Sequence, residues 1–287
     1  METIEQYRKF LKTKMSNIDK YGFVVSFDEM NHAMFDFQKH CTQKALATGR
    51  FALFEDCGLG KTLQQLEWCE KIRIRKNAPV LIIAPLAVVG QTIREAAKFG
   101  YDIERLDAGN IELNQKIYII NYDQLDSVDS SLFIGVALDE SSILKNFEGK
   151  MRNKIIDRFR STPYKSCWTA TPSPNDPMEL GNHSEFLGVM TRNEMLSMFF
   201  VHDGGDTSKW RLKGHAEHKF WQWVSTWAIM INMPSDIGYY DDGYILPDLN
   251  IKELVIETKK RDNGLLFNDV AVNATNFNPS SPHRVSQ

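Results

Sequence analysis

The sequence predicts an α/β protein built on a mostly parallel, doubly wound sheet. Its apolar residues gather in short, continuous runs of strand length, as expected for strands that are buried on both faces of a parallel sheet. Segments with helical spacing of apolar residues separate several of these runs, and strands that alternate with helices are typical of a doubly wound fold. A chain of 287 residues has room for one large domain or two modest ones.

The expected elements follow in order along the chain. An amphipathic helix is expected over residues 4–14, and a second helix over residues 38–47 ends at Thr48-Gly49. The expected strands are residues 51–54, 79–84, 117–120, 132–138 and 167–170, and the expected helices between them are residues 62–75, 88–99 and 151–160. Beyond about residue 190 the chain becomes rich in Met, Trp and Phe, and Phe220, Trp223 and Trp227 recur at helical spacing. These aromatic residues are expected to form the core of an annex.

These patterns divide the chain into four parts. We expect an N-terminal helical extension over residues 1–34 and the main α/β domain over residues 35–190. Residues 191–257 are expected to form a helical annex that ends in a closing strand of the same domain, over residues 251–256. Residues 258–287 read as a linker or loose tail, because their last dozen residues are polar and lack an apolar period.

Composition narrows the class of protein. Lys and Arg number 34 against 37 Asp and Glu, so any surface that binds nucleic acid must be local rather than a property of the whole chain. The four cysteines form no CxxC pair, which favours reduced thiols over a zinc site or a disulfide framework. The first residues are charged, and no apolar run approaches the roughly 20 residues of a membrane-spanning helix. We therefore expect a cytoplasmic protein.

A glycine-bearing turn between a predicted strand and a predicted helix indicates a phosphate-binding loop. Gly58 and Gly60 allow the backbone to curl so that successive N–H groups face an anion, Lys61 can reach the β- and γ-phosphates, and the Thr62 hydroxyl can ligate Mg²⁺. The strict form of this motif has a glycine six residues before the lysine, where this chain has Glu55. The alternative interpretation is a helix N-terminus that carries a solvated lysine.

Two adjacent carboxylates, Asp139 and Glu140, follow the apolar run at residues 132–138. The carboxyl ends of parallel strands form the edge at which such sheets bind ligands. An aspartate there can hold the Mg²⁺ of Mg-ATP, and a glutamate beside it can deprotonate an attacking water. An acidic pair at a strand end is common in itself, so its meaning depends on the phosphate loop.

With these motifs placed, the chain resembles the first RecA-like domain of superfamily 2 helicases. The resemblance is to the DEAD/DEAH-like group that includes the SWI/SNF-type DNA translocases, and most closely to a bacteriophage-type member. It runs from about residue 35 to about residue 257. The motifs that carry it are Phe37-Gln38, Cys57-Gly-Leu-Gly-Lys-Thr62, residues 84–92, Asn121-Tyr122, Asp139-Glu-Ser-Ser142 with Lys145-Asn146, Thr169-Ala-Thr-Pro172, and Ile245-Leu-Pro247.

This resemblance implies a RecA-like domain that binds ATP and Mg²⁺ and contacts DNA. It assigns recognition of the adenine edge to Gln38 and binding of the phosphates to Gly58, Leu59, Gly60 and Lys61. It assigns Mg²⁺ to Thr62 and Asp139, and activation of water to Glu140. The catalytic residues would be Glu140, Lys61 and Asp139. Thr169 and Thr171 would couple the nucleotide to the nucleic-acid surface. The expected contacts to nucleic-acid phosphates are Gln91, Thr92, Asn121 and Lys145, which would position a strand without reading its sequence.

The chain also departs from the family pattern. Ser142 stands where many relatives have His or Asp, so the contact between the acidic motif and the Thr169 motif is expected to differ. No segment after residue 257 resembles the motifs of a second RecA-like domain, which would supply an arginine to the ATP site. That second domain is expected C-terminal to this one or in trans.

The function expected from these observations is that of an ATP-dependent DNA helicase or translocase, present here as its N-terminal motor domain. An alternative is a module that binds nucleotide and clasps nucleic acid or a protein without efficient turnover. A P-loop kinase or GTPase is disfavoured, because the sequence has no Asn-Lys-x-Asp motif for guanine. The compartment implied by the resemblance is the cytoplasm of a bacterial or phage-infected cell, with no membrane partner.

Overall fold

A computed structural model of the chain describes residues 21–106, 114–145, 149–173, 176–203 and 206–245. Within these residues the sheet has seven strands in the order β3-β4-β2-β5-β6-β1-β9, and every neighbouring pair is parallel. The strands are β1 (Arg50–Glu55), β2 (Val80–Ala84), β3 (Ile103–Arg105), β4 (Ile117–Asn121), β5 (Gly135–Asp139), β6 (Tyr164–Thr169) and β9 (Ala228–Ile231). This arrangement confirms the predicted α/β fold with a mostly parallel sheet.

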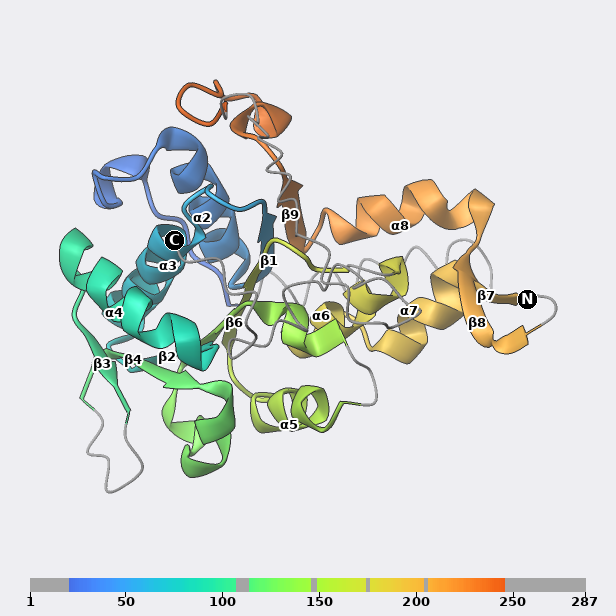
Figure 1. Cartoon of the computed structure of the whole chain (residues 1–287), viewed down its shortest axis with the longest axis horizontal. Coiled ribbons are helices and arrows are strands. Elements are labelled where there is room, and N and C mark those ends of the chain that lie inside the picture. Colours follow the sequence, from blue (N-terminus) through green and yellow to red (C-terminus); the bar gives the residue numbers. More distant parts are fainter. Residues whose placement is uncertain (1–20, 107–113, 146–148, 174–175, 204–205, 246–287) are drawn as a thin grey trace, which may run out of the picture. The chain divides into compact units, whose positions relative to one another are not determined.

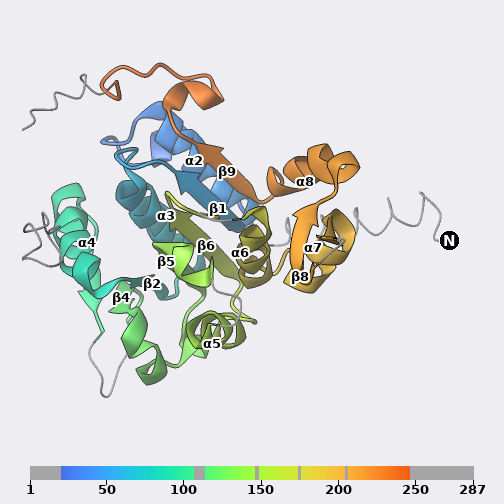
Figure 2. The same cartoon turned by 45° about the vertical axis from the view of Figure 1, so that its right-hand side comes forward.

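Helices cover both faces of the sheet (Figure 1). They are α2 (Asp36–Thr48), α3 (Lys61–Lys76), α4 (Leu86–Phe99), α5 (Lys150–Arg158) and α6 (Leu180–Leu187). Two further helices, α7 (Arg192–Phe199) and α8 (Glu217–Val224), belong to the annex (Figure 2). The side chains of β1 alternate between two buried clusters: Phe51 and Leu53 pack with α2 and α3, whereas Ala52 and Phe54 pack with α5 and α6. The sheet therefore has a hydrophobic core on each face, as a doubly wound fold requires.

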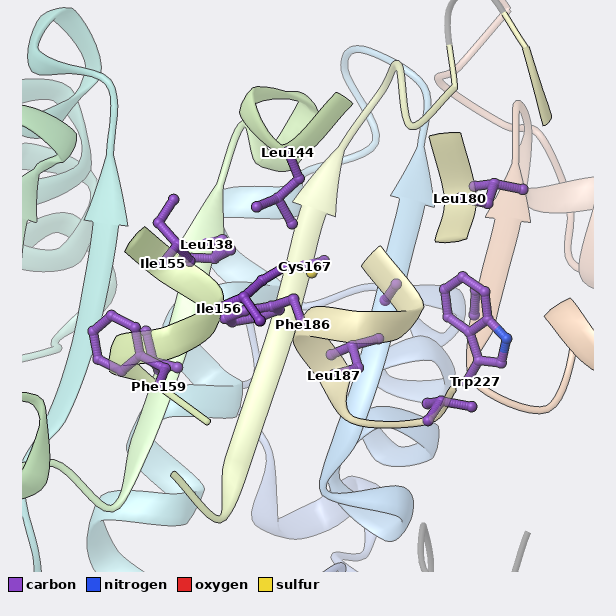
Figure 3. Close-up of a cluster of buried hydrophobic side chains, with 14 of the residues drawn as sticks. Leu138, Leu144, Ile155, Ile156, Phe159, Cys167, Leu180, Phe186, Leu187 and Trp227 are labelled. Atoms are coloured by element: carbon purple, nitrogen blue, oxygen red, sulfur yellow. The ribbon is translucent and has the colours of Figure 1, made fainter. Parts of the chain in front are cut away.

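Figure 3 shows part of the second core, where α5 and α6 lie over β5 and β6. Leu138 of β5 and Cys167 of β6 meet Ile155 and Ile156 of α5 and Phe186 of α6, and all five side chains are at least 95% buried. Burial of a side chain of this size contributes about 1.5–3 kcal/mol. This packing fixes β5 and β6 beside each other, which matters for the residues at their carboxyl ends.

The annex of the domain contains a hairpin as well as helices (Figure 2). Strands β7 (Phe200–Asp203) and β8 (Asp206–Leu212) pair in antiparallel fashion between α7 and α8. Phe199, Phe220, Trp223 and Trp227 form the aromatic core of the annex, with ring centroids 5.3–5.5 Å apart along the chain of contacts Phe220–Phe199–Trp223–Trp227. Phe220, Trp223 and Trp227 were expected as core from their spacing, whereas Phe199 and the hairpin were not expected.

Several boundaries differ from the sequence prediction. Residues 130–132 form a short 3-10 turn, η3 (Ser130–Leu132), so β5 begins later than the apolar run. The edge strands β3 and β9 were not foreseen, and β9 occupies the place beside β1 at the edge of the sheet. The predicted closing strand at 251–256 and the predicted helix at 4–14 lie outside the described residues. Within the described residues, none of the helices is both long and apolar enough to span a bilayer.

Candidate nucleotide site and nucleic-acid edge

The predicted phosphate loop connects the carboxyl end of β1 to the start of α3 over residues 56–60. Gly58 and Gly60 have φ values of 87° and 79°, in the left-handed region that glycine adopts without strain. A Cβ atom on Gly60 would also lie 2.3 Å from Nε2 of Gln38, too close for a contact. Both the backbone turn and the close approach of Gln38 therefore require glycine at position 60.

The Lys61 side chain is bonded to the backbone at the start of the loop. Its ammonium group donates hydrogen bonds to the backbone carbonyls of Glu55, at 2.8 Å, and Asp56, at 2.9 Å. Thr62, on the first turn of α3, is partly exposed. The loop thus presents the start of a 16-residue helix, the Lys61 cation and the Thr62 hydroxyl in one place, which suits a polyphosphate anion.

Gln38 lies behind the loop and is 3% exposed. Its Oε1 accepts a hydrogen bond from Phe35 N at 2.9 Å, and its Nε2 donates to Leu59 O at 2.8 Å. The side chain therefore joins the start of α2 to the phosphate loop. Its oxygen keeps one lone pair and its nitrogen one hydrogen for another partner, so its predicted contact with adenine stays a prediction.

An aromatic cluster lies next to Gln38. Phe35 stacks against Phe37 with centroids 6.4 Å apart, and Tyr244 meets both rings edge-on, at 5.9 Å and 5.4 Å. Phe37 is buried, whereas Phe35 is 59% exposed. An exposed aromatic face beside a loop of this kind offers a surface on which a nucleotide base can stack. Sequence reasoning missed Tyr244, because it lies about 200 residues from its partners.

The predicted acidic pair lies at the same edge of the sheet. Asp139 ends β5 and lies opposite Trp168 of β6, while Glu140 follows with a φ of 49°, a rare conformation for a residue other than glycine. Burial and the neighbouring Glu140 carboxylate raise the pKa of Asp139 to about 6, and the charge of Lys61 opposes this shift. The charge of the loop lysine thus acts on Asp139 of the acidic pair.

Of the two threonines of the predicted coupling motif, Thr169 contacts the acidic pair and Thr171 contacts Thr169. The Thr169 hydroxyl donates to Oε2 of Glu140 at 3.3 Å, and the Thr171 N–H donates to Oγ1 of Thr169 at 3.1 Å. Because β5 and β6 are neighbours, their carboxyl ends bring these groups together. A chain of contacts therefore runs from residue 171 to the side chain proposed to activate water.

A second contact of the acidic motif was missed by sequence reasoning. The hydroxyl of Ser141 lies 3.2 Å from Nε2 of His183 in α6, and both side chains are fully buried. Burial lowers the pKa of His183 to about 4, so this imidazole is neutral at physiological pH. No pattern in the sequence distinguishes such a histidine from an exposed one.

The four predicted nucleic-acid contacts divide into two pairs. Gln91 of α4 and Lys145 after β5 are exposed, and Gln91 donates to Glu95 on its own helix at 2.9 Å. Thr92 is 1% exposed and its hydroxyl donates to Val88 O, one turn earlier in α4. Asn121 is 6% exposed and caps the turn after β4, where its Oδ1 accepts from the backbone N–H groups of residues 123 and 124. The exposed pair is available to a ligand in this conformation.

The residues expected to hold Mg²⁺ can be compared with the donors that this ion needs. In the part of the chain that the structure describes, no three His, Cys, Asp or Glu side chains are grouped as metal ligands. The residues expected to hold Mg²⁺, Thr62 and Asp139, supply one hydroxyl and one carboxylate, which leaves the remaining positions to phosphate and water oxygens. This donor set fits a metal that arrives with the nucleotide rather than one held by the protein.

The sheet order, the phosphate loop and the acidic pair at one edge define a RecA-like α/β fold. Its overall arrangement matches the SWI2/SNF2 ATPase core of Sulfolobus solfataricus, with a TM-score of 0.59 and 20% sequence identity over 71% of this chain and 45% of that one, in a structure solved in complex with dsDNA. A second structure, of the Sulfolobus solfataricus SWI2/SNF2 ATPase core domain, gives the same TM-score with 20% identity over 74% of this chain and 46% of that one.

The chain is also similar in sequence to part of two curated proteins. The chain is 29% identical over 142 residues to a SWI/SNF-related matrix-associated actin-dependent regulator of chromatin subfamily A-like protein 1 of Xenopus tropicalis, which covers 46% of this chain and 15% of that protein. The bovine protein of the same description is 26% identical over 168 residues, covering 55% and 17%. The chain thus matches about a sixth of the length of these relatives. No protein-family model matches it.

Proposed function

We propose that the chain is the first motor domain of an ATP-dependent DNA translocase or helicase of the SWI/SNF type. The observation that carries this proposal is the meeting of the phosphate loop and the acidic pair at one sheet edge, with Lys61 acting on Asp139 and Glu140 bonded to Thr169. The similarity to SWI2/SNF2 ATPase cores supports the same function.

In this proposal each side chain has a separate task. Lys61 exchanges its bonds to the carbonyls of residues 55 and 56 for the β- and γ-phosphates of ATP, which the N-terminus of α3 also attracts. Thr62 and Asp139 would hold Mg²⁺, which neutralises phosphate charge and orients the phosphates when bound. Glu140 accepts the proton of the attacking water, and the Thr169 hydroxyl orients its carboxylate.

DNA is proposed to lie along the exposed part of the same edge. The Sulfolobus core that this chain resembles was solved in complex with dsDNA. Gln91 and Lys145 offer one amide and one cation to phosphates here, and such contacts position a strand without reading its sequence. The bacteriophage-type assignment, and with it the cytoplasm of a bacterial or infected cell, follows from the resemblance of the sequence motifs.

A titration with a fluorescent ATP analogue tests the nucleotide site. Lys61→Ala should abolish binding, because the loop loses the point charge aimed at the phosphates. Lys71→Ala is the matched control: this lysine also belongs to α3 but pairs with Glu67 at 3.2 Å, and its loss should leave nucleotide affinity within about twofold. Equal affinity of Lys61→Ala and the parent chain would refute the phosphate-loop assignment.

A further inference from the structure

Glu55 is the residue that departs from the strict phosphate-loop pattern, and it lies buried beneath the loop. It ends β1 and has no exposed surface. Its Oε2 accepts a hydrogen bond from Nε2 of Gln64 at 2.6 Å, whereas its Oε1 has no N–H or O–H partner among the described residues. A fully buried carboxylate with one amide donor, and with a thiol as its other neighbour, is costly, so this group needs an explanation beyond packing.

Glu55 is connected to the loop through a shared amide. The same Nε2 of Gln64 lies 3.4 Å from Leu59 O, and Nε2 of Gln38 donates to that carbonyl at 2.8 Å. Two glutamine amides thus hold the turn at Leu59, one from α2 and one from α3. The carboxylate of Glu55 orients the amide from α3, because Gln64 is bonded to it more closely than to the loop.

Three other segments bring titratable side chains to Glu55, and of these three side chains Lys61 is the charged one. Lys61 of α3 acts on the carboxylate, and its ammonium is at present bonded to the backbone oxygen of Glu55 itself. The Cys41 thiol of α2 contacts the carboxylate. The Tyr244 hydroxyl, in the segment after β9, interacts electrostatically with the same carboxylate. Burial and the carboxylate raise the pKa of both Cys41 and Tyr244, so both groups remain neutral near pH 7.

Opposing effects act on the pKa of the Glu55 carboxyl. Burial raises the pKa of Glu55 to about 7, although the Gln64 hydrogen bond and the Lys61 charge oppose this shift. Any change in the charge of the loop will therefore change the protonation of Glu55.

We propose that Glu55 is a positioning residue of the nucleotide site that holds the Leu59 turn through Gln64 and takes up a proton when a polyphosphate enters the loop. This inference rests on the proposed nucleotide binding. Two changes drive the uptake: negative phosphates arrive above the carboxylate, and Lys61 turns from the carbonyls of residues 55 and 56 toward them. The proton comes from solvent and converts the carboxylate to a neutral acid, with no other bond formed or broken.

The proposed proton uptake determines the direction in which nucleotide affinity changes with pH. Because binding takes up a proton, nucleotide affinity should fall as the pH rises above about 7, by about threefold per pH unit for an uptake of half a proton. Glu55→Gln keeps an oxygen that accepts from Gln64 but cannot be protonated. In this variant, the decrease in nucleotide affinity that proton uptake by Glu55 causes above about pH 7 should be absent.

Isothermal titration calorimetry measures the proton directly. Mg-ADP is titrated into the full chain at about pH 7.5 in HEPES and in Tris, whose ionisation enthalpies differ, and the difference in observed enthalpy gives the protons exchanged. We expect the parent chain to take up about half a proton more than Glu55→Gln. Glu67→Gln is the matched control, since Glu67 is also a buried glutamate, 1% exposed, but lies within α3 and bonds to Tyr101 and Asn31 away from the loop. It should exchange protons as the parent does.

The outcomes separate this inference from the function on which it rests. Binding by the parent chain with the same proton exchange in Glu55→Gln would overturn the role of Glu55 and leave the nucleotide site intact. An absence of Mg-ADP binding by the parent would overturn both. Gln64→Met gives a second test with Glu55 in place: it removes the amide that favours the carboxylate, so proton uptake on binding should decrease and affinity should fall roughly tenfold. Unchanged uptake and affinity in this variant would also contradict the proposal.

Discussion

At the residue scale, the two glycines of the loop are required for different structural reasons, and substitutions at the two positions can be compared directly. Gly58 needs glycine for its backbone conformation alone, because a Cβ there would meet no atom within 4 Å. Gly60 needs it for its conformation and for the buried Gln38 amide, which could move away only by breaking its bonds to Phe35 N and Leu59 O.

We therefore predict that Gly60→Ala destabilises the fold more than Gly58→Ala. The left-handed backbone should cost about 1 kcal/mol at position 58, and the broken Gln38 bonds should bring the cost at position 60 to about 2–4 kcal/mol. Urea unfolding of both variants measures the difference. Equal losses of unfolding free energy would show that Gln38 does not constrain the loop.

At Glu140, a single substitution can remove the proton-accepting group while keeping the size of the side chain. Replacement by Gln keeps the size of the side chain and an oxygen for the Thr169 hydroxyl, but an amide cannot accept the proton of water. Glu140→Gln should bind Mg-ATP as the parent does and lose its hydrolysis. Phosphate release and nucleotide titration together check this, with the exposed Glu104→Gln as the control. Hydrolysis at the parental rate in Glu140→Gln would exclude Glu140 as the base.

At the element scale, the carboxyl edge of the sheet joins nucleotide and nucleic-acid residues through short connections. The segment η4 (Ser141–Lys145) begins beside Glu140 and ends at the exposed Lys145. Two residues of α6 hold this segment: His183 contacts Ser141, and the Asn182 amide donates to Lys145 O at 3.1 Å. A ligand that contacts Lys145 therefore contacts η4 at its C-terminal end, and the N-terminal end of η4 follows the acidic pair directly in the chain.

Binding of nucleic acid at this edge should be weak and should decrease as salt increases, because the contacts are to phosphates. Lys145→Ala should lower the salt slope of binding by about one, whereas Lys154→Ala, an α5 lysine paired with Asp126 at 2.6 Å, should leave it unchanged. Affinities for single- and double-stranded oligonucleotides across a salt series measure both effects. Salt-independent or strongly sequence-selective binding would contradict contacts to the phosphate backbone.

At the scale of the whole molecule, the 287-residue chain is expected to be a weak ATPase even with DNA. Phosphoryl transfer needs a positive charge near the γ-phosphate, and an arginine finger contributes a factor of about 10³ to 10⁵ in rate. Three arginines of the region after the acidic motif are bonded to carboxylates: Arg152 to Glu185, Arg158 to Asp126 and Arg160 to Asp157. The resemblance to superfamily 2 helicases places the finger on a second RecA-like domain.

Phosphate release measured with and without that second domain, added in trans or in one longer chain, tests this prediction. Addition should raise DNA-stimulated hydrolysis by orders of magnitude, and Lys61→Ala in the longer protein should abolish the gain. Rapid DNA-stimulated hydrolysis by the 287 residues alone would mean that an arginine of this chain, or of a second copy, completes the site.

The sequence alone determined the features that depend on short stretches of chain. Strands buried on both faces appear as continuous apolar runs, so β1, β2 and β4 could be predicted within one residue of their observed ends. The strands β5 and β6 were also predicted, but their starts differ by three residues from the prediction. The phosphate loop and the acidic pair follow two of these runs directly, and parallel strands bring such residues to one edge. Edge strands lack this signal: β3 is three residues long and β9 four, too short for a pattern.

Only the tertiary structure decided how the predicted side chains are used. Thr92 and Asn121 have the residue types of phosphate contacts, yet helix geometry and a cap hold their polar groups inside the protein. Glu55 reads as a missing glycine in the sequence, and only folding places it beneath the loop with Gln64 as its donor. His183 and Tyr244 reach the site from distant segments. Burial and hydrogen-bond partners come from residues far apart in the chain, and they determine which polar group is free to meet a ligand.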